Sequence, residues 1–262
     1  MPRVIELRDV RGHDAFAHEH PAERLRVAAI TPFTTIDFPG KLAAVAFLQG
    51  CPWRCVYCQN PWMQPADFDP ALEHDSWKKL ERLLSRRKGL LDAVVFSGGE
   101  PTADPALLDA ARRVKDMGFM VGLHTGGMLP ARLERVLPHL DWVGLDVKGP
   151  PDDAALYDRI TGRAHSAEHF LESFRMIKDS GIAFECRTTA HPDYLANEKL
   201  VELAHWLKRE EVKTFALQIY RRPPMGLFAG AFPAVGSDYP SEEAFAQLKS
   251  STAVFIERRN DR

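Results

Sequence analysis

The sequence predicts an α/β protein built on a parallel sheet, and three observations support this class. From about residue 41, apolar runs of strand length alternate with segments of helical period, a pattern typical of βαβ units. The length of 262 residues suits one large domain of this class. The composition, with 45% apolar and 27% charged residues, is that of an ordinary globular chain. Six repeats fit either a partial barrel or an open doubly wound sheet.

Each predicted strand is a short apolar run between turn residues. The strands are expected at residues 43–48, 93–97, 119–123, 142–147, 182–189 and 213–220. Helices are expected near 75–87, 104–117, 130–138, 166–180 and 196–210, with a last helix from about 241 to 257. In the second helix Asp104 can cap the start, Pro105 suits the first turn and Gly118 can end it. Gly181 can end the fourth helix in the same way.

The chain divides into three predicted parts. Residues 1–26 are polar and are expected to form an N-terminal extension. Residues 27–235 hold the strand and helix repeats, and residues 236–262 are expected to form a C-terminal helical extension. Residues 221–240 are rich in proline and glycine, so they predict a long loop.

Charge and hydropathy exclude several classes of function. A formal net charge of -2 gives no reason to expect nucleic acid or an anionic membrane as a partner. The sequence holds no apolar run of membrane-spanning length and no signal-peptide pattern. We therefore expect a cytoplasmic protein, in which thiols stay reduced and a cysteine cluster indicates metal binding or catalysis.

Three of the four cysteines lie within one short stretch, GCPWRCVYCQN. Cys51, Cys55 and Cys58 are spaced C-x3-C-x2-C, whereas Cys186 lies inside an apolar run and is expected to be a buried thiol. A structural zinc site needs four ligands, and a [4Fe–4S] cluster normally takes four cysteines. A cysteine trio would leave one iron free to bind a small molecule. The alternative is a zinc loop completed by Cys186 or a histidine.

Two motifs carry a resemblance to a known family. The cysteine spacing, with Tyr57 before the last cysteine, resembles the signature of radical S-adenosylmethionine enzymes, and SGGEP at residues 97–101 is similar to their GGE motif. The segment TTIDFPGKLAAVAFLQGCPWRCVYCQNP resembles glycyl-radical-enzyme activases, and most closely the activating proteins of anaerobic ribonucleoside-triphosphate reductase. Many activases have histidine after the last cysteine, where this chain has Gln59.

The resemblance implies a partial (βα)6 TIM-like barrel with its active site at the carboxyl ends of the strands. It also implies a [4Fe–4S] cluster and S-adenosylmethionine as cofactors. The residues implied to bind metal are Cys51, Cys55 and Cys58, and those implied to bind the cofactor are Tyr57, Gly98, Gly99, Glu100, Thr125 and Asp146. His124 and Gln218 also end predicted strands.

Individual roles follow from the same resemblance. The glycines and Glu100 are implied near the methionine amino group, and the backbone of Tyr57 near the adenine. Thr125 and Asp146 are candidates for the ribose or for a bound cation. The implied catalytic residues are Lys148 and Arg187, which can meet the methionine carboxylate, and Lys148 can alternatively meet a reacting carbonyl. The simpler alternatives are a surface lysine at 148 and a strand-end salt bridge at Arg187.

Three functions remain possible at this level. The first is an activase that makes a glycyl radical on a partner enzyme, with anaerobic ribonucleotide reductase as the expected partner. The second is a radical enzyme acting on a small molecule such as a nucleoside or a deazapurine precursor. The third is a non-enzymatic zinc or redox-binding module. For the activase, a flavodoxin or ferredoxin is the expected electron donor, and the stretch YRRPPMGLFAG, with Met225 and Phe228, is a candidate docking surface for the partner.

Overall fold

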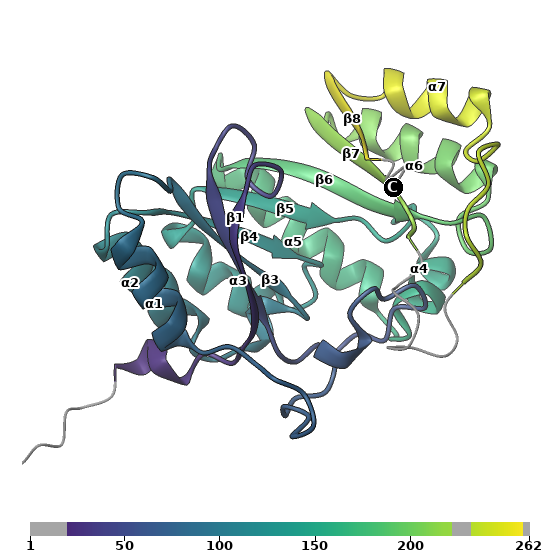
Figure 1. Cartoon of the computed structure of the whole chain (residues 1–262). Helices are drawn as coiled ribbons and strands as arrows, with labels where there is room; N and C mark the ends of the chain where they lie inside the picture. Colours follow the sequence, from purple (N-terminus) through teal and green to yellow (C-terminus); the bar gives the residue numbers. More distant parts are fainter. Residues whose placement is uncertain (1–19, 222–231, 259–262) are drawn as a thin grey trace, which may run out of the picture.

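The computed structural model describes residues 20–221 and 232–258, which form one curved sheet covered by helices (Figure 1). The strands are β1 Val27–Thr34, β2 Ala43–Leu48, β3 Ala93–Gly98, β4 Met120–Thr125, β5 Trp142–Asp146, β6 Ala183–Ala190, β7 Thr214–Ile219 and β8 Val254–Arg258. The α-helices are α1 Trp77–Arg86, α2 Leu107–Asp116, α3 Pro130–Val136, α4 Ala154–Thr161, α5 Ser166–Ser180, α6 Asn197–Arg209 and α7 Glu242–Ser250. Short 3-10 turns are η1 Pro21–Arg24, η2 Pro61–Met63, η3 Pro101–Ala103 and η4 Leu137–His139.

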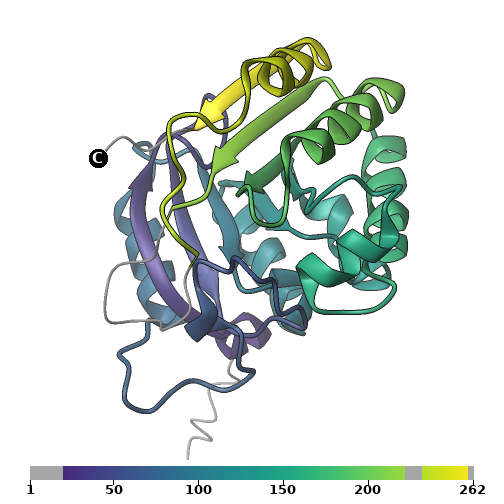
Figure 2. The ribbon, with the colours of Figure 1, turned by 90° about the vertical axis from the view of Figure 1, so that its right-hand side faces the viewer.

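The sheet has eight strands in sequential order from β1 to β8. Strands β2 to β8 run parallel, and β1 pairs with β2 in the antiparallel direction. Within the described residues β1 and β8 do not pair with each other, so the barrel stays open along one side. Figure 2 shows the curvature of the sheet and the helices outside it. The predicted partial barrel of parallel strands is therefore confirmed.

Local sequence explains how the helices pack on the sheet. In α1 the Ser76 side chain accepts a hydrogen bond from the Lys79 amide and so caps the first turn. Trp77, Leu80 and Leu84 then fall on one buried face. The other helices also bury an apolar stripe, and these stripes form one large core with the outward-facing side of the sheet. Every βα unit is thereby fixed to its neighbours, which holds the carboxyl ends of the strands together at one edge.

The structure corrects four details of the sequence prediction. The predicted last helix ends at Ser250, and the following residues form β8 rather than more helix. Strand β1 and helix α4 were not predicted. Helix α2 begins at Leu107 with Ala106 as its N-cap residue, so Asp104 does not cap it. The Asp104 carboxylate instead accepts hydrogen bonds from the Ala106 amide and from Arg26, whereas Gly118 and Gly181 do follow helix ends with positive φ, as predicted.

Candidate functional site

A cavity opens at the carboxyl edge of the parallel strands, where the cysteine loop lies over the strand ends. All eleven predicted site residues line it: Cys51, Cys55, Tyr57, Cys58, Gly98, Gly99, Glu100, Thr125, Asp146, Lys148 and Arg187. His124 and Gln218 line it as well. The structure therefore brings together residues that span more than a hundred positions of sequence.

The cysteine loop is held mainly by its backbone. The Gly50 amide donates to the Met63 carbonyl at 2.7 Å, and the Cys51 amide donates to the Gln64 carbonyl at 3.0 Å. Further along, the amides of Arg54 and Val56 donate to the last carbonyls of α4, at 2.8 and 3.0 Å. These helix-end carbonyls have no partner inside their own helix, so the loop satisfies them. The loop conformation is thus fixed without using the thiols.

The three thiols are free and half-buried, and they share the wall of the cavity. Among the described residues, no three His, Cys, Asp or Glu side chains are grouped as a site for one metal ion. Burial, followed by the charge of Glu100, raises the pKa of Cys51 to about 12, and burial raises the pKa of Cys55 to about 11. Thiolate ligation of iron would therefore release protons from these groups. Three free thiols on one loop are donors that suit an iron–sulfur cluster.

Gly98 and Gly99 are required by close packing of one backbone on another. A Cβ at Gly98, whose φ is +111°, would lie 2.3 Å from the Leu48 amide nitrogen. A Cβ at Gly99 would lie 2.4 Å from the Gly50 carbonyl oxygen, immediately before the first cysteine of the loop. The glycines therefore let the end of β3 lie directly against the base of the cysteine loop. This contact explains both glycines independently of any bound cofactor.

Glu100 is fully buried and joins the ends of β3 and β4. Its Oε1 accepts hydrogen bonds from the hydroxyls of Thr102 and Thr125, at 2.6 and 2.7 Å, and from the Thr102 amide at 3.1 Å. Its Oε2 accepts from the Gly126 amide at 2.9 Å. Burial raises the pKa of Glu100, although these hydrogen bonds oppose the shift. The Thr125 hydroxyl donates its hydrogen to Glu100. The contact between these two side chains therefore holds the ends of β3 and β4 together.

Asp146, Lys148 and Arg187 form an ionic network inside the cavity. Asp146 Oδ2 accepts from Lys148 Nζ at 3.0 Å, and Oδ1 accepts from Arg187 Nε and Nη2 at 3.0 and 2.9 Å. Burial raises the pKa of Asp146, but the two cations outweigh it and hold this pKa well below the ordinary range. Burial lowers the pKa of Lys148, and the Asp146 charge reverses this to a net increase. The network carries an excess of positive charge, which suits an anionic group such as a carboxylate.

The network also bears on the two simpler interpretations, a surface lysine at 148 and a strand-end salt bridge at Arg187. The Lys148 side chain is 13% exposed and lies 5.6 Å above the centre of the Tyr57 ring, so it is not a surface lysine. Arg187 does form a salt bridge, to Asp146, but Arg187 lies three residues before the end of β6 and the bridge lies inside the cavity rather than on the surface. Both side chains can therefore reach a molecule bound there.

Aromatic and imidazole side chains complete the cavity wall. The Tyr57 ring stacks on the Tyr194 ring with centroids 4.7 Å apart, and its buried hydroxyl forms no hydrogen bond with the described residues. His124 Nδ1 lies 3.2 Å from Ser97 Oγ, and its Nε2 lies 2.9 Å from the Asp37 carbonyl oxygen. His124 therefore connects β4 to β3 and to the turn after β1.

Sequence reasoning missed several residues of the cavity wall. The omitted residues include Asp37, Trp53, Asn60, Gln64, Gly126, Met128 and Thr189. Thr189 lies near the end of β6, so the strand-end rule could have found it. Asp37 lies in the turn between β1 and β2, and it was missed because β1 itself was not predicted.

Comparison with protein families agrees with this geometry. The model of the radical SAM superfamily matches residues 45–213, which include the cysteine loop and strands β3 to β6. The chain therefore belongs to the radical SAM superfamily and is a radical SAM enzyme. Its cofactors are those of the family, a [4Fe–4S] cluster and S-adenosylmethionine. Each helix in the described parts of the chain is too short or too polar to cross a membrane.

Two similar relatives are named as activating enzymes. The chain is 32% identical over 187 residues to a putative glycyl-radical enzyme activating enzyme of Methanocaldococcus jannaschii, covering 70% of this chain and 75% of the relative. It is 30% identical over 187 residues to the pyruvate formate-lyase-activating enzyme of Clostridium pasteurianum, covering 70% and 76%. A PqqA peptide cyclase of Rhodopseudomonas palustris is 29% identical over 65% of this chain and 45% of its own length.

Solved structures share the fold. SuiB of Streptococcus suis, bound to S-adenosylmethionine, superposes with a TM-score of 0.61 at 13% identity, covering 81% of this chain and 49% of that one. Native anSMEcpe with bound AdoMet gives a TM-score of 0.51 at 15% identity, covering 79% and 61%. The chain thus spans about half the length of SuiB, and at such identities the likeness concerns the fold alone.

Proposed function

We propose that the chain is a glycyl-radical-enzyme activase and that its partner is anaerobic ribonucleoside-triphosphate reductase. The activating enzymes among its relatives support the first part, and the similarity of the segment at residues 34–61 to reductase activating proteins supports the second. The observation that carries the proposal is the open side of the barrel, because a protein substrate needs room to insert a loop.

This open side has a cavity of its own, here called the lateral cavity. It lies between the turn after β1 and the edge formed by β7 and β8, and it is lined by Thr35, Ile36, Asp37, Pro39, Gln59, Gln218, Ile219, Arg221, Ile256 and Glu257. Asp37, Gln59 and Gln218 belong to both cavities, so the two are neighbours. Ile36 is 65% exposed and lines this cavity. A polypeptide loop entering from this side would therefore approach the site directly.

The predicted docking stretch is only partly within the described residues. Residues 222–231 lie outside them, and these include Met225 and Phe228. Arg221 lines the lateral cavity, whereas Tyr220 is buried. Docking of the partner through residues 220–230 stays a prediction.

Under this proposal, different residues of the cavity would bind the cluster and the methionine carboxylate. Cys51, Cys55 and Cys58 would hold the cluster, which with S-adenosylmethionine supplies one-electron cleavage of the sulfonium and a 5'-deoxyadenosyl radical that removes a hydrogen atom. Lys148 and Arg187 would bind the methionine carboxylate, and Asp146 would keep both cations oriented. These pairings would place the cofactor before the reaction begins.

The remaining assignments concern the strand ends and the source of the electron. The backbone at Gly98, Gly99 and Tyr57 would contact the amino group and the adenine of the cofactor. Glu100 and Thr125 would hold that backbone in place. A flavodoxin or ferredoxin would supply the electron, and a reducing cytoplasm would keep the free thiols available for iron.

A second candidate is a radical SAM enzyme acting on a peptide or a small molecule. The similarity to PqqA peptide cyclases favours it, since these relatives match nearly as much of the chain. Under this alternative the lateral cavity would admit a free peptide rather than a loop of a folded enzyme.

An anaerobic EPR experiment separates the two candidates. The reconstituted protein, S-adenosylmethionine and a reductant are mixed with purified anaerobic ribonucleotide reductase, and the expected result is a doublet glycyl-radical signal on the reductase. The control is a reductase whose radical-bearing glycine is replaced by alanine, which should give no doublet. Formation of 5'-deoxyadenosine only with a peptide or small molecule, and no radical on the reductase, would contradict the activase proposal.

A further inference from the structure

We propose that the outer face of the cysteine loop is the docking surface for an acidic electron-transfer protein. This basic face consists of Arg54, Val56, Arg159 and Arg163. The proposal deepens the proposed function, because it assigns the place at which the enzyme receives the electron it needs. It depends only on the radical SAM chemistry and does not require that the substrate be a glycyl-radical enzyme.

The cysteine loop separates the cavity from the solvent by a single layer of chain. Cys51 and Cys55 line the cavity, while Arg54, between them in sequence, is exposed, and Val56 is 44% exposed. The amides of Arg54 and Val56 donate to the Thr161 and Ile160 carbonyls. The outer face of the loop therefore continues onto the C-terminal end of α4.

Guanidinium groups are fixed on this face by the loop backbone. Arg54 Nη1 donates to the carbonyl oxygens of Cys51 and Trp53, and Arg163 Nε donates to the Pro52 carbonyl oxygen at 2.8 Å. Three consecutive carbonyls of the loop are thus each bound by an arginine. Because a guanidinium has five N–H groups, both arginines keep donors that face the solvent. Two ordered cations therefore lie on the layer that carries the cysteines.

Arg159 extends the positive charge along α4. It is exposed near the C-terminal end of the helix, where the helix dipole favours cations. The neighbouring acids are largely engaged, since Asp158 accepts from the Ser166 amide and hydroxyl at 2.9 and 2.7 Å and Glu168 pairs with His165 at 3.1 Å. A third acid, Asp153, interacts with Arg159 and pairs with Lys199 at 3.0 Å. The neighbouring acids are therefore each engaged, while Arg54, Arg159 and Arg163 are exposed on the face.

This arrangement favours an acidic carrier over a neutral or basic one. Complementary charge steers encounter and fixes orientation, and an exposed apolar side chain such as Val56 adds contact at the centre. The lining of the lateral cavity at the open edge between β1 and β8 includes none of the four residues of the basic face. At this interface the carrier loses one electron and the holoenzyme gains one, with no bond made or broken.

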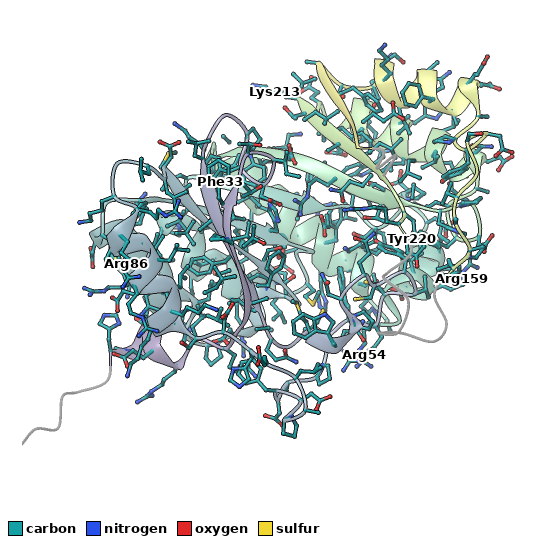
Figure 3. The ribbon with its side chains drawn as sticks, viewed as in Figure 1. Phe33, Arg54, Arg86, Arg159, Lys213 and Tyr220 are labelled. Carbon is teal, nitrogen blue, oxygen red and sulfur yellow. The ribbon has the colours of Figure 1, made fainter. Side chains whose placement is uncertain are left out.

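The test uses the reconstituted holoenzyme and a purified acidic flavodoxin as the probe. Arg159→Glu is the principal variant, because no hydrogen bond to the described residues holds this side chain. Arg86→Glu is the matched control, since Arg86 is an exposed arginine at the end of α1 on the far side of the molecule from Arg54 and Arg159 (Figure 3). The readouts are the flavodoxin Kd by anaerobic calorimetry at low and high salt, and S-adenosylmethionine cleavage driven by dithionite.

Arg159→Glu should raise the Kd at least fivefold and flatten its salt dependence, while dithionite-driven cleavage stays unchanged. Arg54→Gln should raise the Kd as well, and Arg86→Glu should match the unmodified protein. Equal Kd values for Arg159→Glu and the unmodified protein, equal weakening by Arg86→Glu, or no flavodoxin binding at all would overturn the proposal. A protein that binds flavodoxin through this face yet never forms a glycyl radical contradicts the proposed function and not this inference.

Discussion

The two walls of the cavity at the strand ends are built by different means. The loop wall, residues 50–64, has little regular structure and is held by amide-to-carbonyl hydrogen bonds such as Gly50 to Met63. The strand-end wall is held by side chains, in the Glu100–Thr125 contact and in the network of Asp146 with Lys148 and Arg187.

The two walls differ in how far the residues expected to take part in the chemistry also hold the fold together. In the loop wall the thiols take no part in the bonds that hold the backbone, so a cysteine can be replaced with little effect on the fold. In the strand-end wall the polar groups hold one another, so replacing one leaves a buried partner without its counter-charge. A substitution of a loop-wall cysteine should therefore remove activity with little loss of stability, whereas a substitution in the strand-end wall should lower both activity and stability.

The largest effect is expected from Cys55→Ala in the loop wall. This variant should lose its cluster and all S-adenosylmethionine cleavage, because the proposed function makes Cys55 one of the three cluster ligands. Its unfolding temperature without the cluster should stay close to that of the unmodified protein, since the Cys55 carbonyl still accepts from the Cys58 amide at 3.1 Å. Iron and sulfide analysis after anaerobic reconstitution measures the first effect. Full iron content and activity would show that Cys55 is not a ligand.

A nearly as large effect is expected where the two walls touch, at Gly99→Ala. The new Cβ would lie 2.4 Å from the Gly50 carbonyl oxygen, so the cysteine loop must move. We expect a stability cost of about 1–3 kcal/mol, with loss of both iron and cofactor affinity. Gly40→Ala is the control, since a Cβ there meets nothing within 4 Å and only the positive φ of +70° opposes it. If Gly99→Ala loses cofactor affinity and keeps full iron, the glycine serves the cofactor alone.

An intermediate effect is expected for Lys148→Ala in the strand-end wall. Loss of a charge-assisted hydrogen bond costs about 1.5–3 kcal/mol, so cleavage should slow by roughly 10- to 150-fold. Stability should fall too, because Asp146 then loses one of the two cations that hydrogen-bond to it. Lys115→Ala is the matched control, since the Lys115–Asp141 pair, at 2.7 Å, is partly exposed and such pairs contribute little. A rate decrease below about twofold would exclude a role for Lys148.

Sequence patterns predicted the strands whose apolar runs are continuous. Strands β2 to β7 are buried between turn residues, and their predicted positions agree with the structure within a few residues. Strand β1 was missed because it contains Pro32 and because Pro32 and Phe33 are exposed, which weakens the apolar pattern. Strand β8 follows α7 after three residues, and its sequence VFIER continued the predicted helix.

The sequence predicted which residues line the cavity, but it did not predict the hydrogen bonds and contacts between them. Parallel strands end at one edge, so Glu100, Thr125, Asp146 and Arg187 could be placed together from strand ends alone. The sequence could not reveal that the Thr125 hydroxyl donates to Glu100, because the two residues are 25 positions apart and their contact depends on the register of β3 and β4. For the same reason the contact of Gly99 with Gly50 could not be foreseen.

The smallest effect is expected for Cys186→Ala, which lies in neither wall. Cys186 is fully buried in β6, opposite Leu145 in β5 and Phe215 in β7, and burial raises the pKa of its thiol. Removing one sulfur from a packed core leaves a small cavity, so the free energy of unfolding should fall by about 1 kcal/mol.

Iron content and cleavage rate should both be unchanged in this variant. Cys186→Ser is the companion, because it buries a hydroxyl in an apolar site and should cost more stability than alanine while also keeping the cluster. Chemical denaturation together with metal analysis of the purified proteins checks both. Loss of metal from Cys186→Ala would instead make this cysteine a fourth ligand, which is the arrangement that a zinc loop would require.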